Sequence, residues 1–212
     1  MIGCSGETAV EKYYRLHAPM YDLTRWTFLF GRSDILRRVA DLGSAERILE
    51  VGCGTGRNLA ELGRLFPRAR ITGLDLSSAM LERASKRVAP FGSRVELVRR
   101  RYDAPQGLSP TYDLILFSYS LTMFNPGFET AIEAASRDLA PKGRVAVVDF
   151  HDSSWSWFER WVEFNHVRVN GQVRPLLLKR FAPLHDEVRS AYGGIWRYLM
   201  FLGRRPEDVR RK

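Results

Sequence analysis

Short apolar runs alternate with amphipathic segments through the middle of the chain. The runs have the length and composition of strands, and the predicted strands are 47–52, 70–75, 95–100, 112–119 and 144–150. The segments between them have helical spacing, and the predicted helices are 57–66, 77–88 and 128–139, the second with Ser77 or Ser78 as its N-cap. Strands that alternate with helices predict an α/β fold, a doubly wound and mostly parallel sheet.

The carboxyl-terminal part of the chain has a different pattern. Segment 155–165 is rich in aromatic residues and is predicted to be an amphipathic helix, whereas 172–181 is predicted to be irregular. Two strand-like runs, 186–191 and 195–203, flank the pair Gly193-Gly194, which is typical of a hairpin turn. The chain is therefore expected to end in a pair of antiparallel strands.

Three glycines at alternate positions, Gly52, Gly54 and Gly56, follow the first predicted strand, and Glu50 precedes them. Such a turn lets backbone amides approach a ligand closely, with a helix N-terminus behind them. The dinucleotide fingerprint would need a further glycine where Arg57 stands, so that motif is not matched. Asp75 ends the second strand, where its carboxylate can accept hydrogen bonds from both hydroxyls of a ribose.

These residues resemble class I methyltransferases, which use S-adenosylmethionine, over roughly residues 14–204. In that family the E-x-G-x-G-x-G loop holds the methionine moiety and the acid after the second strand holds the ribose. The resemblance implies a Rossmann-like doubly wound sheet that is mostly parallel, with a final antiparallel strand pair. It implies S-adenosylmethionine as cofactor and S-adenosylhomocysteine as product. The cofactor residues that it implies in the loop and after the second strand are Glu50, Gly52, Gly54, Gly56 and Asp75.

The resemblance also implies cofactor contacts after the later strands. Asp103 and its neighbour Ala104 follow the third strand, where the family often places an acid near the adenine amino group; a turn-capping role for Asp103 is the alternative. Leu76 and Met80 are expected to pack on the adenine or to be plain core. The fourth strand ends in Ser118-Tyr119, and in this fold the carboxyl end of that strand lies next to the methyl group that is transferred. Ser118 is therefore a cofactor candidate, and Tyr119 is a catalytic and substrate candidate.

The N-terminal segment resembles the lid of methyltransferases that act on small substrates. The pattern Y-x-x-x-A-x-x-Y-D is present from Tyr14, a substrate candidate, to Tyr21, a cofactor-site and catalytic candidate, and Asp22. We expect residues 1–43 to form a helical lid that also contacts substrate and membrane, with Arg25 binding substrate. Residues 44–204 are expected to form the methyltransferase domain and 205–212 a basic tail.

Three strings, 21–32, 119–126 and 191–198, resemble bacterial lipid-headgroup N-methyltransferases. Two kinds are similar, the betaine-lipid enzymes that trimethylate diacylglycerylhomoserine and the phosphatidylethanolamine N-methyltransferases. The resemblance implies stepwise methylation of a primary amine without a metal. His151 and Tyr21 are the candidates for accepting a proton or orienting the amine. Aromatic side chains are candidates for holding the methylated cation, and basic ones for binding a phosphate or carboxylate: Tyr14, Tyr21, Tyr119 and Tyr192, and Lys179, Arg180 and Arg197.

Charge and composition limit the classes of binding partner that the chain is expected to have. The 212 residues include 33 Lys and Arg against 24 Asp and Glu, a formal charge of +9. That charge suits an anionic bilayer or nucleic acid, although an arginine-rich codon bias would give the same composition. The fourth strand is not followed by the Pro-Pro-aromatic element of base-methylating enzymes, and no nucleic-acid recognition module is present, so nucleic acid is disfavoured.

The expected location is the cytoplasm, at the inner face of the cell membrane. Cys4 and Cys53 are the only cysteines, which favours a reducing compartment, and no secretory signal is visible. The apolar run 26–31 is too short to span a bilayer, so association would be peripheral. Two alternatives stay open, an enzyme acting on a soluble small molecule and a cofactor-binding protein without catalysis. The oligomeric state is not predicted.

Overall fold

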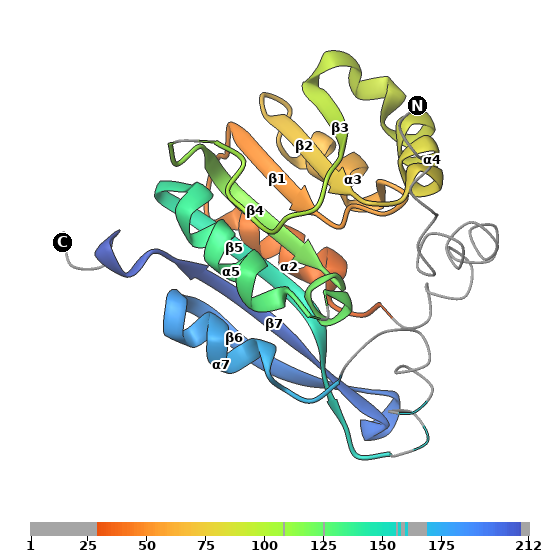
Figure 1. Ribbon diagram of the computed structural model, residues 1–212, viewed down its shortest axis with the longest axis vertical. Coiled ribbons are helices and arrows are strands. Elements are labelled where there is room, and N and C mark those ends of the chain that lie inside the picture. Colours follow the sequence, from red (N-terminus) through yellow and green to blue (C-terminus); the bar gives the residue numbers. More distant parts are fainter. Residues whose placement is uncertain are drawn as a thin grey trace, which may run out of the picture.

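A seven-stranded sheet forms the centre of the protein, in the strand order β3-β2-β1-β4-β5-β7-β6 (Figure 1). The computed structural model describes residues 29–107, 109–124, 126–155, 157, 160 and 169–208. The strands are β1 (Arg47–Val51), β2 (Arg70–Asp75), β3 (Val95–Arg99), β4 (Tyr112–Ser118), β5 (Leu139–Ser153), β6 (Ala182–Ala191) and β7 (Trp196–Arg204).

The sheet is parallel from β3 to β5, and β7 runs antiparallel to both of its neighbours, β5 and β6. The predicted fold class is therefore confirmed. In the central strand, Val51 pairs with Leu74 on one side and with Phe117 on the other. The carboxyl ends of β1, β2 and β4 consequently lie side by side, which is where open α/β sheets bind ligands.

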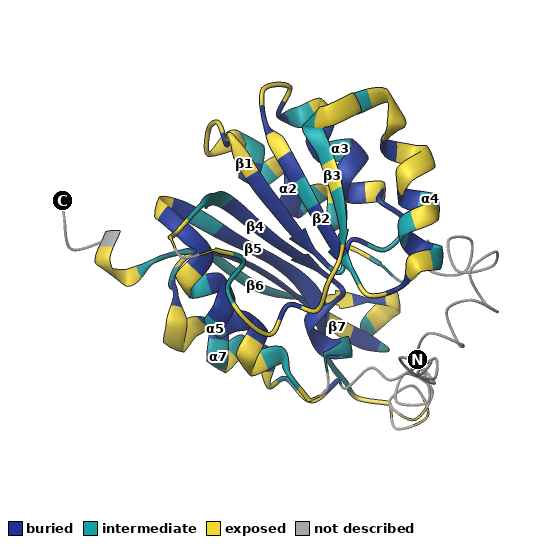
Figure 2. Ribbon diagram, turned by 45° about the horizontal axis from the view of Figure 1, so that its top comes forward, coloured by how far each residue is buried: buried dark blue, intermediate teal, exposed yellow. Residues whose placement is uncertain are grey.

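Helices cover both faces of the sheet. One apolar cluster joins it to α2 (Arg32–Asp41) and α3 (Arg57–Leu65), with α4 (Ser78–Val88) on the same side, and a second joins it to α5 (Phe128–Asp138) and α7 (Val173–Arg180). Figure 2 shows the result, a sheet that is largely buried between helices whose outer sides are exposed. Since both faces are covered, the inner strands are apolar along most of their length, as at Leu114 to Phe117.

Short 3₁₀ turns complete the described elements: η1 (Ala89–Arg94), η2 (Leu121–Met123), η3 (Tyr192–Gly194) and η4 (Pro206–Asp208). The hairpin predicted at Gly193-Gly194 is present, because η3 connects the antiparallel strands β6 and β7 and both glycines have positive φ. Ser77 is the N-cap of α4, and its hydroxyl accepts a hydrogen bond from the Met80 amide at 3.4 Å.

Segment 172–181 was predicted to be irregular, and this prediction is wrong, because Val173–Arg180 is helix α7. Its sequence lacks a clear apolar stripe, and Pro175 falls in its first turn, where proline is tolerated. Tertiary contacts stabilise the helix instead. Leu177 is fully buried, and Arg174 donates two hydrogen bonds to Asp186 on β6, at 2.9 and 2.7 Å.

The other predicted boundaries of these strands and helices agree to within one residue, except in β5 and β6. Strand β5 begins at Leu139 rather than at 144 and ends at Ser153, and β6 begins at Ala182 rather than at 186. In the predicted helix 155–165, the described residues Trp157 and Arg160 are helical and the rest lie largely outside the described residues. Arg205, in the expected tail, donates a hydrogen bond to the Leu139 carbonyl at 3.2 Å. None of the helices in the described ranges is long and apolar enough to cross a membrane.

Candidate functional site

The glycine loop between β1 and α3 has the backbone conformation that only glycine adopts without strain. Gly52, Gly54 and Gly56 have φ of 74°, 54° and 76°. The loop is fixed to the neighbouring strand, because the amides of Gly52 and Cys53 both donate to the Leu74 carbonyl, at 2.8 and 2.9 Å. Sequence and geometry agree that the loop brings bare backbone to the carboxyl edge of the sheet.

The space around the loop differs from glycine to glycine. A Cβ on Gly52 would lie 2.6 Å from the Cβ of Ser120, whereas a Cβ on Gly54 would meet nothing within 4 Å. The Gly54 amide donates to Asp75 at 2.8 Å, and the other carboxylate oxygen of Asp75 accepts from the Ser77 amide at 2.9 Å. Gly54 therefore opens toward a ligand, and Asp75 is oriented beside it by two backbone amides.

Glu50 is buried under the loop with one side-chain bond. Asn58 on α3 donates to Glu50 Oε1 at 2.7 Å, and Oε2 has no hydrogen-bond partner among the described residues. Burial raises the pKa of Glu50 from 4.5 to about 8, against the lowering effects of Asn58 and of the Arg32 charge. A buried carboxylate that lacks a donor fits a cationic, hydrogen-bonding group such as the ammonium of the cofactor's methionine moiety.

Sequence reasoning missed Ser120, although it lies in the loop after β4 that the sequence had singled out. The Ser120 hydroxyl is buried and has no hydrogen-bond partner among the described residues. Ser120 lies against Gly52, because a Cβ added to this glycine would be 2.6 Å from the Cβ of Ser120, and Glu50 stands two residues before Gly52 near the end of β1. Two buried polar groups with incomplete hydrogen bonding thus flank the glycine loop, so the residues present fit the methionine moiety of S-adenosylmethionine.

A buried carboxylate on β5 holds the loop that carries Ser120. Asp149 accepts hydrogen bonds from the Thr122 hydroxyl at 2.5 Å and from the Phe150 amide at 2.8 Å. Burial raises the pKa of Asp149 from 3.8 to about 6. Tyr119 in this loop has φ of 55°, a left-handed conformation that is strained for tyrosine and that is typical of functional sites. An aspartate in the apolar strand Val145 to Phe150 was the sequence signal for this anchor.

A polar cavity of about 220 Å³ lies between the starts of α2 and α3. It is lined by Leu29, Gly31, Arg32, Ser33, Asp34, Arg57, Asn58 and Glu61. Arg32 reaches from this cavity to Ser118 at the end of β4, where its Nε donates to the serine hydroxyl at 3.3 Å. Side chains of both charges line the cavity beside Glu50's partner Asn58, a composition that suits the amino-acid end of the cofactor. Arg32 and Glu61 were not predicted from sequence.

The remaining predicted cofactor residues lie at the same edge of the sheet, except that Met80 is buried in the first turn of α4. Leu76 follows β2 and is 47% exposed, a position open to an adenine. Asp103 and Ala104 are exposed after β3, and Asp103 lies 3.9 Å from Arg101. The loop that carries them is fixed by Tyr102, whose hydroxyl donates to the buried Asp138 at 2.9 Å.

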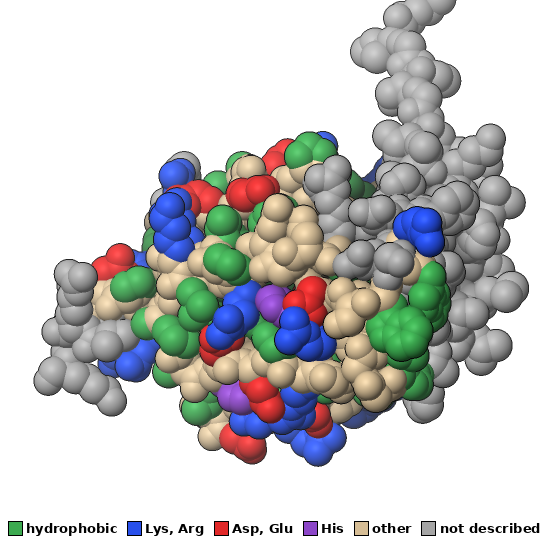
Figure 3. All heavy atoms as spheres, turned by 90° about the horizontal axis from the view of Figure 1, so that it is seen from below, with side chains coloured by type: hydrophobic (Ala, Val, Ile, Leu, Met, Phe, Trp, Pro, Cys, Tyr) green, Lys and Arg blue, Asp and Glu red, His purple; other side chains and the backbone are tan. Residues whose placement is uncertain are grey.

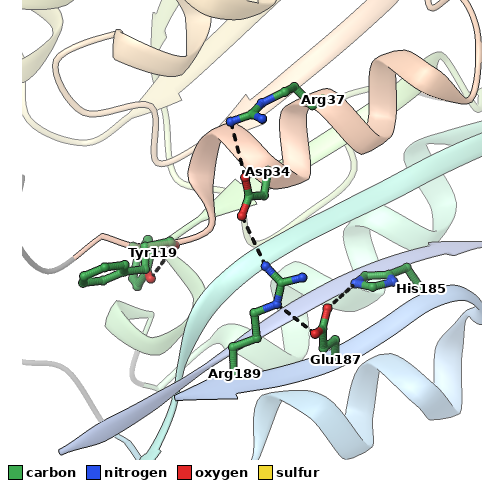
Figure 4. Close-up of polar contacts among 7 residues, drawn as sticks. Asp34, Arg37, Tyr119, His185, Glu187 and Arg189 are labelled. Carbon is green, nitrogen blue, oxygen red and sulfur yellow. Dashed lines mark hydrogen bonds and ion pairs between the residues drawn. The ribbon is translucent and has the colours of Figure 1, made fainter. Parts of the chain in front are cut away.

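An aromatic cluster lies where β4 and β5 end and β7 begins. It is made of Phe30, Tyr119, Phe150, Tyr192, Trp196 and Tyr198. Tyr119 is buried, its ring packs 4.9 Å from that of Phe150, and its hydroxyl donates to the Phe30 carbonyl at 2.8 Å (Figure 4). Burial raises the pKa of Tyr119 well above its usual value. Tyr119 therefore keeps its proton and positions Phe30.

Ion pairs fasten the start of α2 to the edge strand β6 (Figure 4). Arg189 bonds Asp34 on α2 at 3.2 Å and Glu187 on its own strand at 2.8 Å. Arg37 lies 3.4 Å from Asp34, and His185 lies 3.1 Å from Glu187. These ionic contacts connect the segment that carries Phe30 and Arg32 to the edge strand β6.

His151 and Arg197 meet at the end of β5. Arg197 forms a bidentate ion pair with Asp152, and His151 Nε2 lies 3.7 Å from the same carboxylate. Burial lowers the pKa of His151, although Asp152 opposes this, so the imidazole is neutral near pH 7. Figure 3 shows histidine side chains among acidic and basic ones on this side of the molecule.

The other predicted substrate residues are dispersed. Lys179 and Arg180 are the last residues of α7, just before Ala182. Ala182 pairs with Arg204, which pairs with Arg144 in the amino-terminal half of β5, at the edge of the sheet opposite the glycine loop. Arg180 also forms an ion pair with Glu133 at 2.6 Å. The structure thus places these two away from the glycine loop. Tyr192 is 49% exposed in the β6–β7 turn. Tyr14, Tyr21 and Arg25 lie outside the described residues.

Residues 48–143 match the family model of a methyltransferase domain. The chain is 30% identical over 138 residues to the ubiquinone/menaquinone biosynthesis C-methyltransferase UbiE of Syntrophotalea carbinolica, across 63% of this chain and 57% of that enzyme. N-methyltransferase NodS of Bradyrhizobium japonicum, solved with S-adenosyl-L-homocysteine, has a TM-score of 0.77 at 19% identity, covering 94% of this chain and 100% of that one. Phosphoethanolamine N-methyltransferase 2 of Haemonchus contortus, solved with phosphomonomethylethanolamine and S-adenosylhomocysteine, has a TM-score of 0.74 at 15% identity, covering 94% and 61%.

Residues 48–143 thus match a methyltransferase domain, the sheet order is that of the solved methyltransferases, and the glycine loop fits their cofactor S-adenosylmethionine. The aligned part of the chain spans about half the length of the first curated relatives that it matches. The solved structures share its fold at low identity. The acceptor of the methyl group is therefore a separate question.

Proposed function

We propose that this chain transfers methyl groups from S-adenosylmethionine to the primary amine of a membrane lipid headgroup, stepwise, at the cytoplasmic face of the membrane. The acceptor is diacylglycerylhomoserine or phosphatidylethanolamine, each of which presents an amine beside an anion. The observation that carries the proposal is the aromatic cluster where β4 and β5 end and β7 begins, beside the glycine loop.

Aromatic rings suit an amine that is methylated in steps. Each methyl removes an N–H, so the quaternary product cannot donate a hydrogen bond, whereas an aromatic face attracts the cation by about 0.5–2 kcal/mol. Phe30 and Tyr192 are the exposed members of the cluster, at 39% and 49%, and their rings stand perpendicular with centroids 5.3 Å apart. Trp196, which is fully buried, packs 5.8 Å from Phe30 and fixes that ring.

The mechanism needs alignment more than acid–base chemistry. S-adenosylmethionine, when bound, supplies a methyl group on a sulfonium, which is already activated for in-line displacement. Glu50 and Ser120 would hold the methionine moiety and Asp75 the ribose, which fixes the direction of transfer. His151 is neutral near pH 7 and can accept the proton that the amine loses, and Tyr119 orients Phe30 through its hydroxyl. Tyr21 is a further candidate for contacting the amine.

The similar proteins support more than one acceptor. Two of the solved structures are N-methyltransferases by name, one of them with a phosphorylated ethanolamine bound, which favours an amine. UbiE is a C-methyltransferase of quinone biosynthesis, so the alternative acceptor is a small molecule other than a lipid amine. The strings at 21–32, 119–126 and 191–198 favour the lipid headgroup over that alternative.

The test is methyl transfer from labelled S-adenosylmethionine to two sets of liposomes, one with diacylglycerylhomoserine and one with phosphatidylethanolamine, with products resolved by mass spectrometry. We expect mono-, di- and trimethylated lipid in one set. Detergent-dispersed lipid and soluble amines serve as parallel acceptors. Cofactor binding without methylation of either lipid, in liposomes or in detergent, would overturn the lipid proposal and favour a soluble acceptor.

A further inference from the structure

The exposed aromatic side chains gather at one end of the molecule. Among the described residues, the large apolar side chains that are mostly exposed include four aromatic ones, Phe30 at 39%, Trp155 at 51%, Trp157 at 51% and Tyr192 at 49%. We call these four the aromatic rim. All four lie where β5 ends, where β6 turns into β7, or where the chain enters α2. Three of the exposed leucines, Leu42, Leu178 and Leu184, lie on other elements.

The rim is fixed to the ends of strands. The Ser153 hydroxyl at the end of β5 donates to the Ile195 carbonyl at 2.7 Å and accepts from the Trp155 amide at 2.9 Å. Trp155 is thereby tied to the hairpin that carries Tyr192. The rings of Trp155 and Trp157 lie nearly perpendicular with centroids 6.5 Å apart, and Tyr192 contacts Phe30 in the same way. The two ring pairs thus belong to neighbouring strand ends.

The composition of the rim fits the interface of a bilayer. Indole and phenol rings have an apolar body and a polar edge, and they are enriched at the headgroup level of membranes. Trp157 and Arg160 are both helical and exposed, and their three-residue spacing places them on one side of the helix. A basic side chain beside exposed tryptophans, on a chain of formal charge +9, is complementary to anionic lipid.

The aromatic rim lies next to the aromatic cluster proposed to bind the amine. Phe30 and Tyr192 belong both to the rim and to the aromatic cluster proposed to hold the methylated amine, and Trp155 is joined to them through Ser153 and the hairpin. Figure 3 looks onto this side of the molecule, where a group of hydrophobic side chains lies at the margin of the described surface. A lipid whose acyl chains stayed in a bilayer under the rim could reach the site with its headgroup alone.

We propose that the aromatic rim is the surface that this protein lays on an anionic bilayer, with Trp155 and Trp157 inserted at the headgroup level. The proposal rests on the proposed function in that it names the partner of the same site. It assigns bilayer contact to two residues that lie outside the binding cluster. Their replacement should therefore impair the approach to the membrane and leave the chemistry intact.

The experiment compares the double variant Trp155→Ala/Trp157→Ala with Leu42→Ala/Leu184→Ala, which removes side chains of similar exposure, 49% and 42%, on other elements. Binding is measured by sedimentation with phosphatidylglycerol vesicles and with phosphatidylcholine vesicles, at low and high salt. For the wild type we expect binding to the anionic vesicles that salt weakens, and quenching of tryptophan fluorescence by brominated acyl chains.

The rim variant is expected to bind anionic vesicles at least about tenfold more weakly, which corresponds to about 1.4 kcal/mol, and the leucine variant within about twofold of wild type. Methylation of lipid in vesicles should fall with the rim variant, while methylation of the same headgroup on a short-chain, monomeric analogue should not. Melting temperature and S-adenosylhomocysteine affinity, unchanged in both variants, show that the fold is intact.

Two results would overturn the rim proposal. One is equal vesicle binding by the rim variant and the wild type; the other is self-association of the wild type without lipid that the rim variant lacks, which would make a second copy the occupant. In either case methylation of the monomeric analogue would still support the proposed function. Conversely, vesicle binding through the rim without methylation of any lipid amine would support the rim and refute the lipid acceptor.

Discussion

The two halves of the sheet's carboxyl edge present opposite kinds of surface. At the ends of β1, β2 and β4 the protein offers bare backbone at three glycines and two buried polar groups, Glu50 and Ser120, whose hydrogen bonding is incomplete among the described residues. Where β5 and β6 end and β7 begins, the arginines are already paired, Arg197 with Asp152 and Arg189 with Glu187 and Asp34, and the open surface is aromatic.

The difference indicates what each half recognises. Unsatisfied buried polar groups favour a ligand that supplies hydrogen bonds and charge, because leaving them unmet costs about 1–3 kcal/mol each. A surface of rings beside neutralised arginines favours a ligand recognised by shape and by cation–π attraction. The cofactor half is thus suited to the polar end of S-adenosylmethionine, and the aromatic half is compatible with the alkylated amine that we propose as the product.

Replacement of Gly52 by alanine should have the largest effect on the cofactor half. The new Cβ would lie 2.6 Å from Ser120 Cβ, at a φ of 74°. Gly193→Ala is the matched control, because Gly193 has φ of 67° and ψ of 17° and an added Cβ meets nothing within 4 Å. Both variants should lose about 1–2 kcal/mol of stability, but only Gly52→Ala should weaken S-adenosylhomocysteine binding, by about a hundredfold. Calorimetric titration measures the affinity for S-adenosylhomocysteine, and equal affinities of the two variants would show that Ser120 can move aside without disturbing the cofactor site.

The raised pKa of Glu50 should appear as a pH dependence of the stability of the cofactor-free protein. Its pKa is raised from 4.5 to about 8, so over that range the folded protein keeps a proton that the unfolded chain has lost. The free energy of unfolding should therefore fall as pH rises, by up to about 1.4 kcal/mol per pH unit. Asp149 acts in the same direction only up to about pH 6. Urea unfolding between about pH 7 and about pH 8 measures mainly Glu50, because His151, whose pKa is lowered from 6.5, acts in the opposite direction below that window.

Glu50→Gln is the control for that pH dependence, since glutamine keeps the shape and can still accept from Asn58. Its unfolding free energy should be flatter across the same window. Curves for wild type and variant that fall in parallel would show that another group titrates.

The loop after β4 carries Ser120 of the cofactor half and Tyr119 of the acceptor half, and Thr122 attaches this loop to β5. Its hydroxyl is bonded to the buried Asp149 at 2.5 Å, and valine of the same shape removes that donor. Thr122→Val should lower the unfolding free energy by about 1–3 kcal/mol because the carboxylate stays buried with fewer donors. Thr122→Ser keeps the hydroxyl and should lose less. Chemical unfolding compares the two, and equal losses would mean that the methyl packing matters as much as the hydrogen bond.

The ion pairs of the acceptor half should matter least. Arg189 and Asp34 are 33% and 41% exposed, so water screens their attraction. Arg189→Gln is expected to change the unfolding free energy by less than about 1 kcal/mol, and Arg137→Gln, which removes the more exposed pair with Glu133, by even less. Denaturant unfolding of both variants checks this; a large loss for Arg189→Gln would show that the ionic contacts between α2 and β6 act as a network.

The sequence by itself determined the fold class, the parallel strands from β1 to β5 and the cofactor loop. These features are local, because alternating apolar runs define strands and three glycines define a backbone conformation. The position of Asp75 follows as well, since the strand that it ends lies next to β1. The same local reasoning failed at α7, where Leu177 and the Arg174–Asp186 pair stabilise a helix that lacks an apolar stripe.

Only the tertiary structure decided which distant residues share the site. Tyr119 bonds the Phe30 carbonyl across 89 positions, Arg189 bonds Asp34 across 155, and Ser120 lies against Gly52. Such contacts follow from the order β1-β4-β5-β7-β6, which periodicity does not specify, because any strand with two buried faces looks alike in sequence. The glycine loop and the place of Asp75 beside it could therefore be predicted from the sequence, whereas the position of Ser120 and the whole acceptor half required the fold.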